Sequence, residues 1–180
     1  MAPPLRFCQR AIATHRTSAA IASFVVSVAS APHAAGFRAY ASYTRLSGKF
    51  ANDATTGLPP QLVPAGARLP GVPLASAYAE MTGSYPRAAG FEAALEMQYV
   101  GKIYVNDRNT DAAPASTMSN VRISFEQRGE RWVLREFARL NNLTNRSYVG
   151  TVIVGDANGR YFEPAAKRNA LFGISIGANY

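Results

Sequence analysis

The sequence is almost without cysteine and histidine, the residues on which most metal sites and many catalytic sites depend. Its 180 residues include one cysteine and two histidines, namely Cys8, His15 and His33. From residue 34 onward there is no partner for a disulfide, no Cys/His zinc ligand and no histidine for a Ser-His or Cys-His pair. The sequence therefore predicts no catalytic residue, no metal site and no cofactor, and we expect a protein that is not an enzyme.

Charged side chains are also scarce, at 17% of the chain, against about 25% in ordinary globular proteins. The formal net charge of +8 would suit an anionic partner such as nucleic acid. The arginines and lysines are scattered singly, however, without a basic run or an aromatic-basic motif. We therefore expect no nucleic-acid partner, and the low charge with 14 glycines and nine tyrosines favours an all-β fold.

Long hydrophobic runs are missing too, and the apolar stretch AAIASFVVSVASA covers only residues 19–31. A transmembrane helix needs about 20 apolar residues. Three arginines precede this stretch: Arg6, Arg10 and Arg16. Ala29 and Ala31 stand at the spacing of a small-residue cleavage site, so residues 1–36 are expected to be a signal-peptide-like leader. The alternative is a non-native start joined to a truncated reading frame.

What the sequence does contain is alternation of apolar and polar residues, clearest in FEAALEMQYVGKIYV, residues 91–105. One parity is apolar, whereas the other holds Glu92, Glu96, Gln98 and Lys102. A period of two predicts a strand with one apolar and one polar face. At about 3.3 Å per residue the strand would be about 50 Å long. This length exceeds the usual five or six residues of a strand and suits a tilted membrane-spanning strand of about 9 to 11 residues with extensions.

Similar alternation predicts five further strands, and the connections between the strands alternate in length. The further strands cover residues 37–47, 74–85, 121–126, 132–140 and 170–180. Residues 86–90 and 128–130 form short turns, whereas residues 48–73, 106–116 and 150–169 form long polar loops. Outer-membrane barrels have short periplasmic turns and longer outer loops. The sequence therefore predicts an all-β fold of about six antiparallel, up-and-down transmembrane β-strands in a Gram-negative outer membrane.

The acidic residues indicate neither catalysis nor metal binding. Glu92 and Glu96 share the polar parity, where carboxylates facing a water-filled barrel are ordinary. The DANG run at residues 156–159 lacks the spaced oxygen ligands and closing Glu of an EF-hand, so it predicts a turn. Glu136 alone falls on the apolar parity of its strand, which indicates a bulge, an error of register or a position at the barrel rim.

The C-terminal segment carries an NNL run followed by RSY, then GRYFEP, a basic residue before the last strand, and a terminal aromatic. In this combination residues 139–180 resemble the end of TonB-dependent outer-membrane receptors, which import iron-siderophore complexes. The matching residues are Asn142, Leu143, Tyr148, Gly159, Glu163, Pro164 and Tyr180. ASYTRL, RLPGVP and YVGKIYVNDRNT extend the resemblance upstream, so that it covers residues 37–180. Thr144, Asn145 and the final tyrosine depart from the family pattern.

The resemblance implies a barrel of about 22 strands, closed by a plug domain whose TonB box contacts TonB. Neither a plug nor a TonB box is visible in the sequence, so we expect a fragment that matches the last quarter of a receptor and does not transport alone. Ferric siderophore and TonB are then partners of the intact family member only. The expected partners of this chain are outer-membrane lipid and the barrel-assembly machinery, which recognises an aromatic C-terminal strand.

The last long loop contains the candidate ligand-binding residues, Arg160, Tyr161, Phe162, Lys167 and Arg168. In an intact receptor they would bind an anionic ferric siderophore through charge and stacking. The alternative is a solvated loop with an aromatic residue at the barrel rim. Two other function classes also stay open at this stage: a small independent outer-membrane barrel or adhesin, and a soluble secreted β-sandwich that acts as a binding module.

Overall fold

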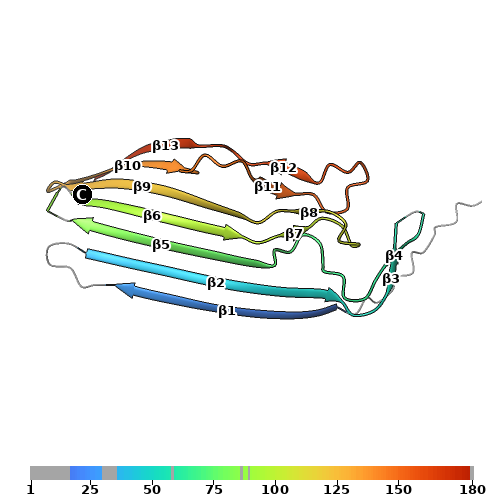
Figure 1. Ribbon diagram of the computed structural model, residues 1–180. Helices are drawn as coiled ribbons and strands as arrows, with labels where there is room; N and C mark the ends of the chain where they lie inside the picture. Colours follow the sequence, from blue (N-terminus) through green and yellow to red (C-terminus); the bar gives the residue numbers. More distant parts are fainter. Residues whose placement is uncertain (1–16, 30–35, 58, 86, 89, 179–180) are drawn as a thin grey trace, which may run out of the picture.

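The computed structural model describes residues 17–29, 36–57, 59–85, 87–88 and 90–178. These residues form strands, turns and loops (Figure 1), which confirms the predicted all-β class. Within the described residues, no helix has the length and apolar character needed to cross a membrane.

Seven long strands form one antiparallel sheet in the order of the chain. They are β1 (Thr17–Ala29), β2 (Gly36–Phe50), β5 (Ala75–Tyr85), β6 (Phe91–Val100), β9 (Ser116–Arg128), β10 (Trp132–Asn141) and β13 (Asn169–Ala178). Each strand pairs with the next along the chain without a register shift. The predicted up-and-down topology is therefore confirmed. β1 and β13 are the two outer strands, so the described strands form an open sheet.

β1 lies in the segment that the sequence predicts to be a leader. Its 13 residues pair continuously with β2, from Thr17 opposite Phe50 to Ala29 opposite Arg38. The sheet thus has one more long strand than the six expected from alternation. Pairing in the sheet does not test whether the segment is removed from the protein, so the division into a leader, 1–36, and a barrel segment, 37–180, stays a prediction.

Short and long connections lie at opposite ends of the sheet, as predicted from the sequence. The β5–β6 and β9–β10 connections are short and lie at one end of the sheet, on the left in Figure 1. The long connections lie at the other end and contain three small two-stranded ladders. These are β3 (Ala54–Thr56) with β4 (Gln61–Val63), β7 (Ile103–Tyr104) with β8 (Ala112–Ala113), and β11 (Val149–Val152) with β12 (Phe162–Pro164).

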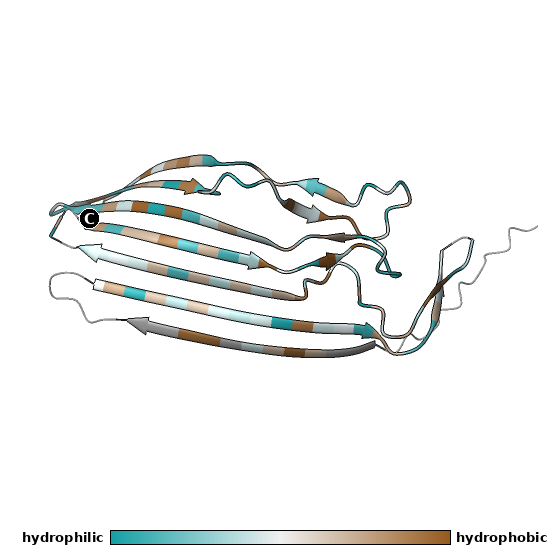
Figure 2. Cartoon of the chain, in the orientation of Figure 1, coloured by the Kyte–Doolittle hydropathy of each residue, from teal (hydrophilic) through white to brown (hydrophobic). Residues whose placement is uncertain are grey.

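The pairing register places the apolar and polar residues on opposite faces of the sheet, which appear as alternating bands along the strands in Figure 2. We call one side the apolar face; it includes Ala39, Ala41, Met81, Leu95, Met97, Ile123, Phe125, Phe172, Ile174 and Ile176. We call the other the polar face; it includes Arg38, Glu80, Glu92, Glu96, Asn120, Arg122, Glu126, Arg135 and Arg139. Side chains alternate between the two faces along each strand, and the register aligns them from strand to strand. The sheet therefore has two chemically different sides.

In this sheet some polar residues are buried and many apolar residues are exposed, the reverse of what is expected for a sheet in water. On the polar face, Glu96 is 4% exposed and Thr82 is 2% exposed, whereas Ile174 on the apolar face is 73% exposed. The fully buried apolar side chains Val63 and Val105 lie at the loop end rather than between two sheets. The apolar face of this sheet is thus the exposed one.

Glu136 lies on the apolar face, directly opposite Phe125 of β9 and Ile174 of β13. The ladder is regular on both sides of β10, so neither a bulge nor an error of register explains its parity. Its carboxylate accepts a long hydrogen bond of 3.5 Å from Gln127 Nε2 on the same face. It lies in the middle of β10, so the rim position is wrong as well.

Candidate functional site

The polar face carries ion pairs that connect strands distant in the sequence. Arg122 of β9 and Arg139 of β10 are directly opposite each other, an arrangement of like charges that destabilises a sheet unless carboxylates lie beside it. Glu92 lies 3.5 Å from Arg122 Nη2 and also accepts a hydrogen bond of 2.7 Å from Arg38 Nη2. Glu96 accepts two hydrogen bonds from Arg139, of 2.8 and 2.5 Å. Arg122 and Arg139 therefore pair with different carboxylates, Glu92 and Glu96, and Glu92 also binds Arg38.

The Glu96 site is an enclosed part of this face. Its side chain is 6% exposed and that of Arg139 is 28% exposed. Asn120 Nδ2 also donates to Glu96, over 3.4 Å, while Asn120 Oδ1 accepts from the backbone N–H of Asn142. The polar face thus connects through Asn120 to the first residue of the long β10–β13 connection.

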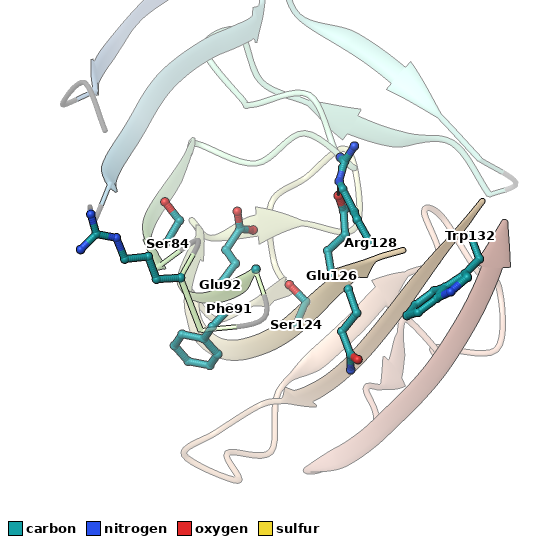
Figure 3. Close-up of a pocket in the computed structure, with 10 residues that line it drawn as sticks. Ser84, Phe91, Glu92, Ser124, Glu126, Arg128 and Trp132 are labelled. Carbon is teal, nitrogen blue, oxygen red and sulfur yellow. Dashed lines mark hydrogen bonds and ion pairs between the residues drawn. The ribbon is translucent and has the colours of Figure 1, made fainter. Parts of the chain in front are cut away.

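A broad basin of about 870 Å³ lies on the polar face at the end with the short turns. Figure 3 shows Glu92, Glu126 and Arg128 on this side of the sheet, with the ring of Phe91 on the other. Glu126 accepts hydrogen bonds from Arg135 Nε, 2.5 Å, and Arg128 Nε, 2.7 Å. The carboxylate of Glu126 is therefore paired with two guanidinium groups.

A second cleft, of about 430 Å³, lies among the long loops. It is lined by residues 56, 57, 59 and 61, by residues 106–108 and 110, and by residues 154–157 and 161. Its charged residues are Asp107, Arg108 and Asp156. Arg108 Nη1 donates to Gln61 Oε1 over 3.1 Å and so joins two of these loops. No three potential ligands among His, Cys, Asp and Glu converge on a metal position in the part of the chain that the structure describes.

Asparagine and aspartate side chains, together with backbone groups, hold the loops together around this cleft. Asn109 has a φ of 58° and bonds both backbone groups of Arg68, accepting from its N–H at 2.6 Å and donating to its carbonyl at 2.8 Å. Asparagine tolerates such positive φ values better than most residues. Gly155 N–H donates to the carbonyl of Val105, 2.9 Å away. The DANG run forms the predicted turn, in which Asp156 Oδ2 accepts from the N–H of Arg160 at 2.8 Å.

The structure brings one of the five predicted ligand residues into the loop cleft. Tyr161 lines it, and its ring lies 6.2 Å from that of Phe162, which begins β12. Arg160, Lys167 and Arg168 are exposed and do not line it. Arg168 N–H instead donates to Asn145 Oδ1 over 3.1 Å. Whether any of the five contacts a ligand stays a prediction.

Sequence reasoning missed one charged residue of this cleft, Arg108. Its signal was the polar NDRNT run that directly follows an alternating strand, since loops at strand ends commonly carry function. That run did not reveal which distant loops would approach it.

The family-motif residues mostly organise the β10–β13 connection. Asn142 is 2% exposed, and its side chain bonds both the carbonyl and the N–H of Arg146. The backbone carbonyl of Tyr148 accepts a hydrogen bond from the backbone N–H of Ala165. This contact lies next to the β11–β12 ladder, which contains Glu163 and Pro164. The others are surface positions: Leu143 is 37% exposed, and Gly159 has a φ of 72° in the turn described above. Tyr180 lies outside the described residues.

A single antiparallel up-and-down sheet with an exposed apolar face and a charged, partly buried opposite face has the fold of a barrel wall. No protein-family model matches the sequence. Among solved structures, the chain is similar to the siderophore receptor PiuA from Acinetobacter baumannii, with a TM-score of 0.66 and 16% identity. The match covers 88% of this chain and 22% of the receptor chain. The likeness shows a receptor-like barrel fold, and the chain spans about a fifth of that receptor's length.

Proposed function

We propose that this chain is a wall segment of a TonB-dependent, siderophore-receptor-like β-barrel in the outer membrane of a Gram-negative cell. One observation carries the proposal: the sheet exposes its apolar face and encloses the carboxylate of Glu96 on its charged face. Phe172 and Ile176 are each 75% exposed, whereas Glu96 is 4% exposed. Water would oppose this distribution, because exposed apolar surface costs about 25 cal/mol per Å². Lipid outside and water inside would favour it.

The aromatic residues of the apolar face support a membrane position. Tyr43 and Tyr99 are both directly opposite Ala77, so they form one row toward the loop end. Tyr85, eight residues further along β5, lies at the turn end opposite Phe91. Eight residues span about 27 Å along a strand. After a tilt of about 40°, this corresponds to about 20 Å of height, close to the ~25 Å apolar band between aromatic girdles.

Transport of a ferric siderophore and contact with TonB belong, on this proposal, to an assembly larger than the described sheet. The described strands form an open sheet that has two outer strands, and they do not enclose a pore. An unpaired strand edge in lipid is costly, so the sheet would need further strands beside it before it could enclose a path. The segment by itself is expected to bind lipid and to lack uptake activity.

The soluble β-sandwich alternative is less well supported. A sandwich would need a second sheet packed about 10 Å from the apolar face. In the described ranges, the additional ladders lie at the loop end, and Met81, Leu95 and Met97 stay 46–52% exposed. The face that a sandwich would bury is thus uncovered.

The test is expression of the full chain in a Gram-negative host, followed by membrane fractionation and electrophoresis with and without boiling. The proposal predicts recovery in the outer-membrane fraction and a mobility that changes on heating. A periplasmic, soluble product with the same mobility before and after boiling would refute it.

A further inference from the structure

The two outer strands of the sheet share a sequence pattern. β1 contains Phe24-Val25-Val26-Ser27-Val28, and β13 contains Phe172-Gly173-Ile174-Ser175-Ile176. In both, an aromatic is followed at steps of two by β-branched aliphatic residues, with a serine between the aliphatic pair. The chain therefore carries two versions of the same short strand, one near each end of the described sheet.

The two strands also run in the same direction. Seven strands in up-and-down order alternate in direction, so the first and the seventh are parallel to each other. β1 is antiparallel to β2. β13 of a second copy with the same membrane orientation would therefore also be antiparallel to β2 and could take the place of β1. Beside β1 itself, that strand would be parallel and would need a different hydrogen-bond pattern.

The register of β1 on β2 shows how a replacement strand would fit. Val28, Val26 and Phe24 are directly opposite Ala39, Ala41 and Tyr43. In the equivalent register, β13 of a second copy would place Ile176, Ile174 and Phe172 at those positions. Ile176 and Ile174 of the second copy would then be paired with alanines of β2.

The other face of the same pairing is also complementary in size. Gly177 and Ser175 of β13 would lie opposite Arg38 and Tyr40, so small residues would meet two bulky residues of β2, and Gly173 would lie opposite the small Ser42. Phe172, Ile174 and Ile176 are 73–75% exposed on their outer strand, and burial beside another copy would remove part of that exposure.

We propose that residues 17–29 compete with β13 of a second copy for the edge of β2, so that release of this segment permits head-to-tail assembly of the chain. Such an interface joins two different surfaces and therefore continues from copy to copy or closes into a ring. The proposal depends on the proposed function only for the membrane environment; the competition itself follows from strand direction and register.

Cysteine cross-linking in the full chain tests this directly. The chain would carry Cys8→Ser, Ala39→Cys and Ile176→Cys, refolded into lipid vesicles and oxidised. Within one copy, β2 and β13 are five strand spacings apart, about 24 Å, which is too far for a disulfide. A bond between these positions therefore reports two copies paired in the proposed register.

In one variant, Val25→Pro and Val26→Pro are added to release β1, because adjacent prolines remove one hydrogen-bond donor on each side of the strand. We expect the parent to stay at one chain mass, 19.3 kDa, and the proline variant to form a reducible ladder in steps of that mass. The matched control replaces Ala39→Cys with Tyr40→Cys, on the other face, and should give no ladder.

A second preparation covers the case in which the proline variant does not fold. A protease site replaces residues 30–35 and is cut after refolding, which allows β1 to leave a sheet that has already formed. The ladder should appear after cutting, and an added peptide of residues 17–29 should suppress it. No ladder in a preparation whose electrophoretic mobility still changes on heating, or an equal ladder before and after cutting, would overturn the inference. The first of these results would leave the proposed membrane function intact.

Discussion

Single residues on the polar face are stabilised by partners from other strands. Glu96 lies in β6, yet its carboxylate is held by Arg139 of β10 and by Asn120 of β9, which lies between them in the sheet. Its enclosure makes this contact different in energy from the exposed ion pair of Glu126 with Arg128, whose side chain is 69% exposed. Exposed pairs contribute about 0–1 kcal/mol, whereas removing one partner of a buried pair costs about 3–5 kcal/mol.

Arg139→Met tests this difference. The substitution leaves Glu96 enclosed without its cation, and we expect a loss of about 3 kcal/mol, the lower end of the range because Arg139 is partly exposed. Arg128→Met is the matched control and should cost less than about 1 kcal/mol. Urea unfolding in lipid vesicles, followed by tryptophan fluorescence of Trp132, measures both. Equal losses for the two variants would contradict the assigned enclosure of Glu96.

Among the elements, the short β5–β6 connection depends on one glycine. Gly90 has a φ of 60°, and a Cβ at this position would lie 2.5 Å from the carbonyl oxygen of Glu126 on β9. By contrast, a Cβ added at Gly83 in β5 would have no neighbouring atom within 4 Å. The turn thus needs glycine both for its backbone conformation and for its close approach to the neighbouring strand.

Gly90→Ala should therefore destabilise the sheet, by about 1–2 kcal/mol for the left-handed conformation alone and more because of the close approach. Gly83→Ala, in the open strand position, should be neutral or stabilising by up to about 1 kcal/mol. The midpoints of urea unfolding of the two variants provide the comparison. If Gly90→Ala unfolded at the same urea concentration as Gly83→Ala, the described turn would be wrong.

The elements also show what the sequence can and cannot predict. β6 follows from its alternation, because each parity meets a different environment. β1 does not, because both parities of TSAAIASFVVSVA are apolar or small, a composition equally suited to a leader. The loop cleft was unpredictable for another reason: Asn109 and Arg68 are 41 residues apart, and no local pattern indicates their contact. Glu136 is a polar residue on the apolar face, yet the ladder around it is regular. Its polarity therefore did not predict its structural position.

The sheet as a whole has two chemically distinct faces, and the proposed membrane position depends on them. The apolar face extends over neighbouring strands, with Leu95 opposite Met81 on β5 and Val121 on β9. At the next residue, Glu96, the polar face has Glu80 and Asn120 opposite. Because the strand alternates strictly, adjacent residues of β6 should experience lipid and water in turn.

The most direct measurement is a nitroxide scan of β6 in membrane-inserted protein. Single cysteines are introduced at residues 91–100 in a Cys8→Ser chain and spin-labelled, and collision with oxygen is compared with collision with a water-soluble nickel chelate. We predict a period of two, with odd positions such as Met97 accessible to oxygen in the lipid and even positions such as Gln98 accessible to nickel. Nickel access at the odd positions, or no alternation along the strand, would contradict the assignment of the apolar face to lipid.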